Sequence, residues 1–181
     1  MDIEKLKEVS GRILKGSEIS SERGIYNGFI ILFENEKILV YDSYDTAEKA
    51  NDLRFRRYFE KHPQQLIYLW EEYASDNAEK EEWKKYIDAD ALGEWLTDNF
   101  DKFTSGRYKN SPYREEIFKN LKSDPVSKME MFAGGDIGRL STYLHQFFDL
   151  SEMIPYLQEM MESRIYEYDG FYFLPMVELP E

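Results

Sequence analysis

The chain of 181 residues has the length of one ordinary domain and contains no cysteine, which excludes disulfide bonds, thiolate nucleophiles and Cys-ligated metal sites. Its 36 acidic and 23 basic residues give a formal net charge of −13, a field that repels phosphates and attracts basic surfaces. We therefore expect a basic nucleic-acid-binding protein or ribonucleoprotein as partner, and no direct binding to DNA.

The distribution of apolar residues bears on localisation. The first residues lack the apolar stretch of a signal peptide, and no later apolar run approaches the length that spans a membrane. We expect a cytoplasmic protein with no membrane association. We also expect no cofactor.

The N-terminal third predicts a short helix followed by a hairpin. Ile3, Leu6 and Val9 recur at near-helical spacing before Gly11. The β-branched and aromatic runs 28–33 and 38–41 are separated by four polar residues, which is typical of a β-hairpin.

A long helical stretch follows. A capping pattern at Asp45 opens a helix that we expect to run to about Lys61, and further helices are predicted after Pro63, after Asp76, over 91–100 and from Pro112 to about Leu121. Residues 128–132 are interpreted as a strand. Helices are then expected after Asp136, where the preceding glycines favour a capped turn over a phosphate-binding loop, and over 150–161.

The C-terminal region contains a second hairpin signal. Asp169-Gly170 separates residues 164–168 from 171–174, and this dipeptide favours the positive φ angles of a tight turn. Two hairpins flanking mainly helical sequence predict an α+β fold, with an antiparallel sheet and several helices packed against it. We expect a single domain over 1–181, with a possible internal boundary near 122–125.

The segment 66–101 combines all three tryptophans with many acids. Residues 62–101 contain 11 acids and 3 bases. Aromatic rings could anchor a protein interface there while carboxylates take the positions of phosphates on a basic partner. The alternative is that the rings face a core and the acids are solvated. The predicted partner-binding residues are Trp70, Glu71, Glu72, Asp76, Glu79, Glu81, Glu82, Trp83, Asp88, Asp90, Glu94, Trp95 and Asp98.

A catalytic alternative rests on His145 and Asp149. Four residues apart, they would share a face of one helix and could contribute to a metal site. Nothing in the sequence selects a third ligand from its 36 acids. The pair would serve a metal-dependent nuclease, or an effector promoting RNA cleavage. We assign no metal ligands.

In overall character the sequence resembles a known class of inhibitors. A small cysteine-free chain with acidic, aromatic helices is similar to the phage and mobile-element proteins that inhibit host nucleases, of the anti-CRISPR and anti-restriction types. Immunity proteins for nuclease toxins share this character. The resemblance implies a non-enzymatic inhibitor that occupies the basic nucleic-acid-binding surface of a nuclease or CRISPR effector.

Overall fold

A computed structural model describes residues 20–21, 29–33 and 36–181. Its contacts divide the chain into two compact units. The sheet unit comprises residues up to 58 together with 154–181, and the helical unit comprises residues 59–153. Residues 122–125 lie inside the helical unit, and the expectation of a single domain stays a prediction. The helix expected before Gly11 lies outside the described residues.

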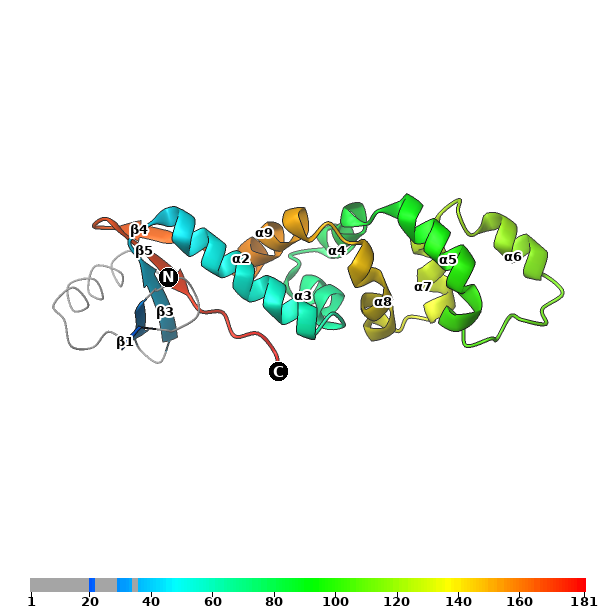
Figure 1. Ribbon diagram of the computed structural model, residues 1–181, viewed down its shortest axis with the longest axis horizontal. Helices are drawn as coiled ribbons and strands as arrows, with labels where there is room; N and C mark the ends of the chain where they lie inside the picture. The colour runs from blue at the N-terminus through cyan, green and yellow to red at the C-terminus, as the bar shows by residue number, and fades with distance from the viewer. Residues whose placement is uncertain (1–19, 22–28, 34–35) are drawn as a thin grey trace. The chain divides into compact units, whose positions relative to one another are not determined.

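The sheet unit contains the two predicted hairpins, joined edge to edge. Among the described residues, five antiparallel strands lie in the order β1-β2-β3-β5-β4 (Figure 1). Their bounds are β1 Ser20–Ser21, β2 Phe29–Phe33, β3 Glu36–Tyr41, β4 Tyr166–Tyr168 and β5 Phe171–Pro175. β3 pairs with β5, with Leu39 opposite Leu174. The fold class is α+β, as predicted.

The C-terminal hairpin turns at Asp169 and Gly170. Their φ angles are 52° and 76°, and Tyr168 pairs directly with Phe171 across the turn. Two successive positive φ values are typical of a type I′ turn, whose twist matches that of the flanking strands. The turn prediction is confirmed.

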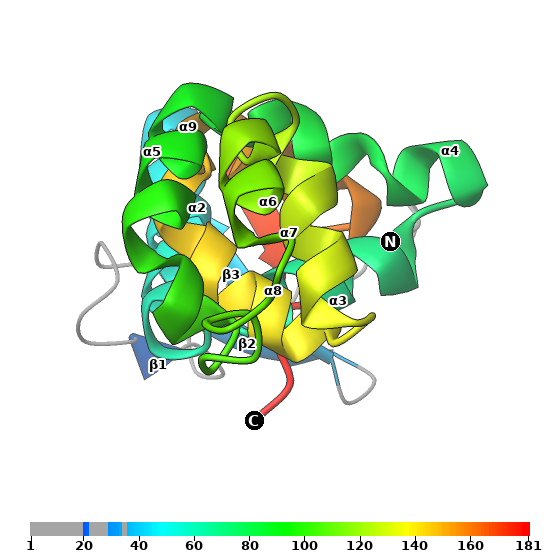
Figure 2. The same ribbon diagram turned by 90° about the vertical axis from the view of Figure 1, so that its right-hand side faces the viewer.

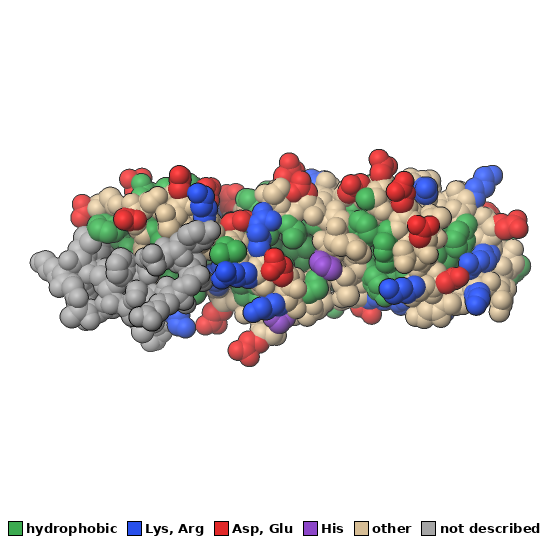
Figure 3. Space-filling view, viewed as in Figure 1, with side chains coloured by type: hydrophobic (Ala, Val, Ile, Leu, Met, Phe, Trp, Pro, Cys, Tyr) green, Lys and Arg blue, Asp and Glu red, His purple; other side chains and the backbone are tan. Residues whose placement is uncertain are grey.

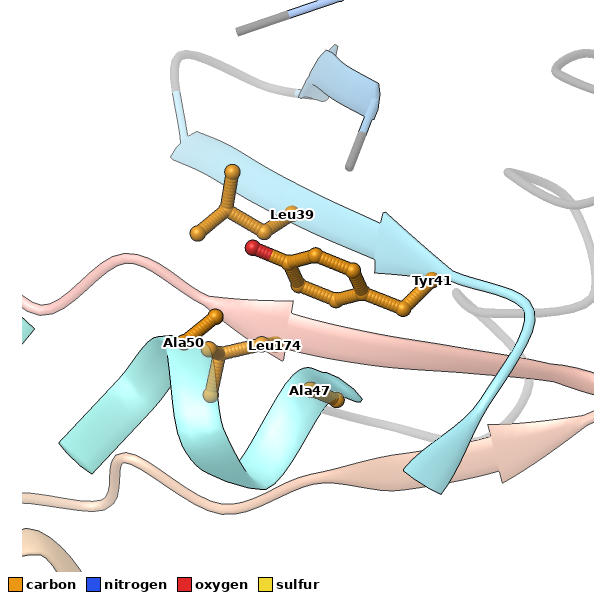
Figure 4. Packing of buried hydrophobic residues seen from close by; sticks show 5 residues of the cluster. All are labelled: Leu39, Tyr41, Ala47, Ala50 and Leu174. Carbon is orange, nitrogen blue, oxygen red and sulfur yellow. The ribbon is translucent and has the colours of Figure 1, made fainter. Parts of the chain in front are cut away.

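One face of the sheet packs on the first turns of α2, which spans Tyr44–Lys61. Leu39, Tyr41 and Leu174 lie against Ala47 and Ala50, whose small side chains let the helix approach the strands closely (Figure 4). Buried residues also occupy the opposite face of the sheet, namely Ile38, Val40 and Phe173. Burial on both faces explains why residues 38–41 of β3 form a continuous apolar run.

The helical unit begins in α2 and ends in α9, Leu150–Met160. Between them lie α3 Gln65–Tyr73, α4 Asn77–Lys80, the 3-10 helix η1 Glu82–Tyr86, α5 Ala89–Phe103, α6 Arg114–Asn120, α7 Pro125–Ala133, α8 Ile137–Leu144 and the 3-10 helix η2 His145–Phe147. Figure 2 shows α5, α6 and α7 side by side. The predicted helices are present with shifted ends.

An aromatic cluster joins α5, α6 and α7. Phe100 is 1% exposed, and its ring centroid lies 5.2 Å from that of Phe118 and 5.0 Å from that of Phe132, both in edge-to-face geometry. Tyr108 packs on Phe100 and Phe132 from the loop after α5. Aromatic pairs of this geometry add to the stabilisation from burial, so the cluster fixes the packing of the three helices.

The strand interpretation of residues 128–132 is wrong, because these residues belong to α7. Asp124 caps the helix by accepting a hydrogen bond from the Ser127 N–H, and Pro125 occupies its first turn. Asp-Pro is therefore a helix start here. The apolar residues Val126, Met129, Phe132 and Ala133 follow helical spacing and are buried.

The turn between α7 and α8 is a capped turn, as expected. Gly134 and Gly135 have φ angles of 65° and 80°, and Asp136 accepts a hydrogen bond from the Arg139 N–H at 2.9 Å. The carboxylate of Asp136 thus occupies the N-terminus of α8, the place an anion would take.

Within the described part of the chain, the helices are too short or too polar for any of them to cross a bilayer.

Candidate partner-binding surface

Two of the three tryptophans predicted to bind a partner lie in the core. Trp70 is 0% and Trp83 1% exposed. The indole N–H of Trp70 donates to the carbonyl oxygen of Glu79 at 2.8 Å, which holds α4 against α3. Burial rules out Trp70 and Trp83 as interface anchors in this fold, and it corrects their assignment to the partner-binding surface. Aromatic residues at helical spacing follow the core alternative here.

Three of the candidate acids serve helix ends or loops. Asp76 accepts hydrogen bonds from the N–H groups of Ala78 and Glu79, each at 2.8 Å, and so caps α4. Asp88 caps α5 through the Ala91 N–H at 3.0 Å. The carboxylate of Glu79 accepts from the Ser75 N–H. Reversing the charge of these residues would disturb local structure as well as the surface potential.

Glu81 and Glu82 are engaged by lysines. The ammonium of Lys84 pairs with Glu81 and, at 2.9 Å, with Glu130 of α7, and Lys85 pairs with Glu82 at 2.7 Å. Burial lowers the pKa of Lys84, but the hydrogen bonds to the two glutamates outweigh it and the net pKa is raised. Positive neighbours partly neutralise this part of the acidic segment.

Glu71 stands next to this network on α3. Burial raises the pKa of its carboxyl group, and the negative charges of Glu81 and Glu130 raise it further, against the lowering effect of Lys80 and Lys84. Ionisation of Glu71 is therefore less favourable than that of an isolated carboxyl group.

The remaining candidate acids are exposed and unpaired. Glu72, Asp90, Glu94 and Asp98 form no ion pair with any residue the structure describes. Asp90, Glu94 and Asp98 lie four residues apart along α5, so their carboxylates follow one face at steps of about 6 Å. We call this set the α5 stripe. Acidic side chains gather over the start of α5 in Figure 3.

Trp95 lies beside the α5 stripe and is half-buried. Its ring packs against Tyr143 at 5.5 Å, Phe147 at 5.8 Å and Phe103 at 6.5 Å between centroids. Three aromatic neighbours hold the ring in place, and part of it remains accessible. A rigid, partly exposed tryptophan next to carboxylates has the composition of an interface anchor.

His145 and Asp149 do not share a helix, which corrects the premise of the catalytic alternative. His145 begins η2, with its Nδ1 2.9 Å from the carbonyl oxygen of Thr142. Asp149 precedes α9 and accepts hydrogen bonds from the N–H and hydroxyl of Ser151. Within residues 20–21, 29–33 and 36–181, no three His, Asp or Glu side chains are grouped as a metal site would require.

The sequence prediction did not identify a polar pocket in the sheet unit. It has a volume of about 390 Å³ and lies between the first half of α2 and the second half of α9. Tyr44, Glu48 and Asn51 are one helical turn apart, which places them on one face of α2. The sequence contains this spacing, but the pairing of α2 with a helix more than 100 residues later is a tertiary feature.

Comparison with protein-family models, with curated proteins and with solved structures finds no match to this chain.

Proposed function

We propose that the protein is a non-enzymatic inhibitor that covers the basic nucleic-acid-binding surface of a nuclease or CRISPR effector. The observation that carries the proposal is the α5 stripe. Three exposed carboxylates without ion-pair partners in the described structure lie on one helix face, and a partly buried tryptophan, held by aromatic neighbours, adjoins them.

The electrostatics of the α5 stripe suit a basic partner. A lysine at 102 follows one turn after Asp98 and ends the stripe, so the negative run extends over about two turns of helix. Unpaired surface carboxylates steer a positively charged protein and fix its register, whereas paired ones contribute little to the field. Burying Trp95 against the partner would supply the apolar part of the binding free energy.

Only part of the acidic segment belongs to the proposed binding surface. Glu79, Glu81 and Glu82 are engaged in hydrogen bonds or ion pairs inside the protein, so they lose interactions if they are turned toward a partner. Glu94 and Asp98 lose none among the described residues. They are therefore the residues to change.

The test uses a double variant, Glu94→Lys with Asp98→Lys, and a matched control, Glu167→Lys with Glu178→Lys. Both variants change the net charge by the same amount, and Glu167 and Glu178 are exposed residues of the sheet unit. The immobilised wild-type protein is first used to isolate a basic nuclease or effector from bacterial lysate. Cleavage of DNA or RNA by that purified partner is then measured against increasing concentrations of each protein.

We expect wild type and control to inhibit cleavage in competition with the nucleic acid, and the Glu94/Asp98 variant to inhibit about tenfold less well. Inhibition should weaken between about 0.1 M and about 1 M salt, because screening shortens the reach of the charges. Equal inhibition by the two variants, or inhibition that nucleic acid does not compete away, would contradict the proposal.

A further inference from the structure

The pocket between α2 and α9 is built on a buried polar pair. The Asn51 side-chain amide donates to the carbonyl oxygen of Ser163 at 3.1 Å, and the Ser163 hydroxyl donates back to Asn51 Oδ1 at 3.0 Å. The two residues are 3% and 4% exposed. This reciprocal pair ties the chain after α9 to α2 and fixes the base of the pocket.

The chain reaches Ser163 through an unusual backbone conformation. Glu162 has φ of 58°, in the left-handed region that non-glycine residues rarely adopt. The Ser163 N–H consequently returns to the carbonyl oxygen of Gln158 at 2.7 Å, which closes the end of α9. Buried hydrogen bonds thus fix the backbone at Ser163, which lines the pocket.

The walls of the pocket carry negative charge. Glu48 of α2 and Glu159 of α9 both line it and are exposed, and the C-terminal end of α9 adds the negative pole of the helix dipole. Among the described residues, the one basic side chain that lines it is Arg164, which lies 3.7 Å from Glu159 with side chains 59% and 68% exposed. A pair that long and that exposed is weak, so an incoming cation could displace Arg164.

Two further polar residues line the pocket. Tyr44 is 48% exposed, and its ring is held edge-to-face by Tyr172 at 5.8 Å, which leaves aromatic surface accessible to a cation. Gln158 lines the pocket, and its buried Nε2 has no hydrogen-bond acceptor within the described part of the chain. An unsatisfied buried amide donor of this kind is costly.

We infer that this pocket binds an arginine side chain of a protein partner. The guanidinium group is planar, carries donors on several sides and stacks on aromatic rings, so it can engage Glu48 and Glu159 together while covering Tyr44. The pocket volume lies within the range of about 300–1,000 Å³ of ligand sites.

The inference rests on the proposed function in one respect, namely that the partner is basic. The pocket itself belongs to the sheet unit, whereas the α5 stripe belongs to the helical unit. The probe is N-acetyl-arginine amide, titrated into the isotope-labelled full chain and followed by NMR. The comparison ligand is N-acetyl-citrulline amide, which has nearly the same shape with a neutral urea in place of the guanidinium group.

We expect the arginine amide to bind at least about tenfold more tightly than the citrulline amide, with shifts at Tyr44 and Gln158. Glu48→Gln and Glu159→Gln should each weaken binding about three- to tenfold. Glu60→Gln, an exposed position on α2 outside the lining, should leave it unchanged. Arg164→Gln should tighten binding, because it removes the competing cation.

Equal binding of arginine and citrulline amides would overturn the inference. So would an Arg164→Gln variant that loses binding, since that result would identify an anion site, or a lysine amide that binds as well as the arginine amide. The arginine amide should still bind the Glu94→Lys, Asp98→Lys variant. If the arginine amide binds neither the wild type nor any variant, while Glu94→Lys with Asp98→Lys still weakens inhibition, the pocket inference is wrong and the proposed function stands.

Discussion

The hydroxyl of Ser141 caps a helix that lies 74 residues earlier in the sequence. At the start of α3 the Gln64 side chain makes no capping bond in the described structure. Instead the Ile67 N–H donates to Ser141 Oγ at 3.3 Å, and that hydroxyl donates to the Pro63 carbonyl oxygen at 2.5 Å. Ser141 and Ile67 are both 0% exposed, so water cannot replace the bond.

Ser141→Ala should lower the free energy of unfolding of the helical unit by about 2 kcal/mol. The buried Ile67 N–H loses its acceptor, which costs about 1–3 kcal/mol. The Pro63 carbonyl oxygen still accepts a hydrogen bond from the Leu66 N–H at 3.3 Å, so losing the Ser141 hydroxyl costs it less than it costs the Ile67 N–H. Thr142→Ala is the matched control, because the exposed Thr142 hydroxyl donates to the Gly138 carbonyl oxygen of the same helix, α8. This variant should change the free energy of unfolding by no more than about 0.5 kcal/mol.

Urea unfolding followed by tryptophan fluorescence measures this difference. All three tryptophans belong to the helical unit, so the signal reports that unit. With an m value of about 1–1.5 kcal/mol/M for a unit of this size, the Ser141→Ala midpoint should fall by about 1.5 M. Hydrogen exchange at the Ile67 amide should accelerate about 30-fold. A Ser141→Ala midpoint equal to that of Thr142→Ala would refute the capping argument.

The remaining predictions concern a charge and a turn. Glu71→Gln should stabilise the helical unit at neutral pH by at most about 0.5 kcal/mol, because the raised pKa penalises the ionised carboxylate in the folded state and exposure screens the effect. This gain in stability should shrink as the pH falls from the raised pKa toward 4.5, and it should disappear below pH 4.5, because the carboxyl group is then protonated in both the folded and the unfolded state. Urea midpoints of the wild type and the variant across that pH range test the sign. A gain that grows toward acidic pH would contradict the argument. Gly170→Ala should cost the sheet unit about 1 kcal/mol, because alanine rarely adopts the φ of 76° found here; an added Cβ would meet no described atom within 4 Å, so the loss comes from the backbone alone. Gly170→Asn should cost less, because asparagine tolerates this conformation. Thermal unfolding followed by circular dichroism compares the two variants, and an equal loss would point to a cause other than backbone strain.

Parts of the fold could be predicted because their signals are local. Asp169-Gly170 determines its own turn geometry, and the continuous apolar run of β3 matches a strand buried on both faces. The strand interpretation of 128–132 failed because short apolar runs fit either a strand or a buried helix. Asp124-Pro125, which lies within the predicted internal boundary near 122–125, was the local signal that favoured the helix.

The candidate surface was less predictable. Trp70, Trp83 and Trp95 have similar neighbours in the sequence, yet Trp70 and Trp83 are fully buried and Trp95 is partly exposed. Their exposure depends on which helices cover them. Likewise, Lys84 engages Glu130 of α7, 46 residues away, so the sequence did not show which acids remain unpaired.

The sequence by itself determined the acidic charge, the absence of thiol chemistry, most of the helical segments and the tight C-terminal turn. Each of these depends on composition or on residues a few positions apart. The tertiary structure decided which tryptophan borders the surface, which carboxylates form the α5 stripe, how Ser141 caps α3 and where α2 and α9 enclose a pocket. These features require contacts between segments distant in the chain, whose pairing follows from packing the whole of each unit and not from any local pattern.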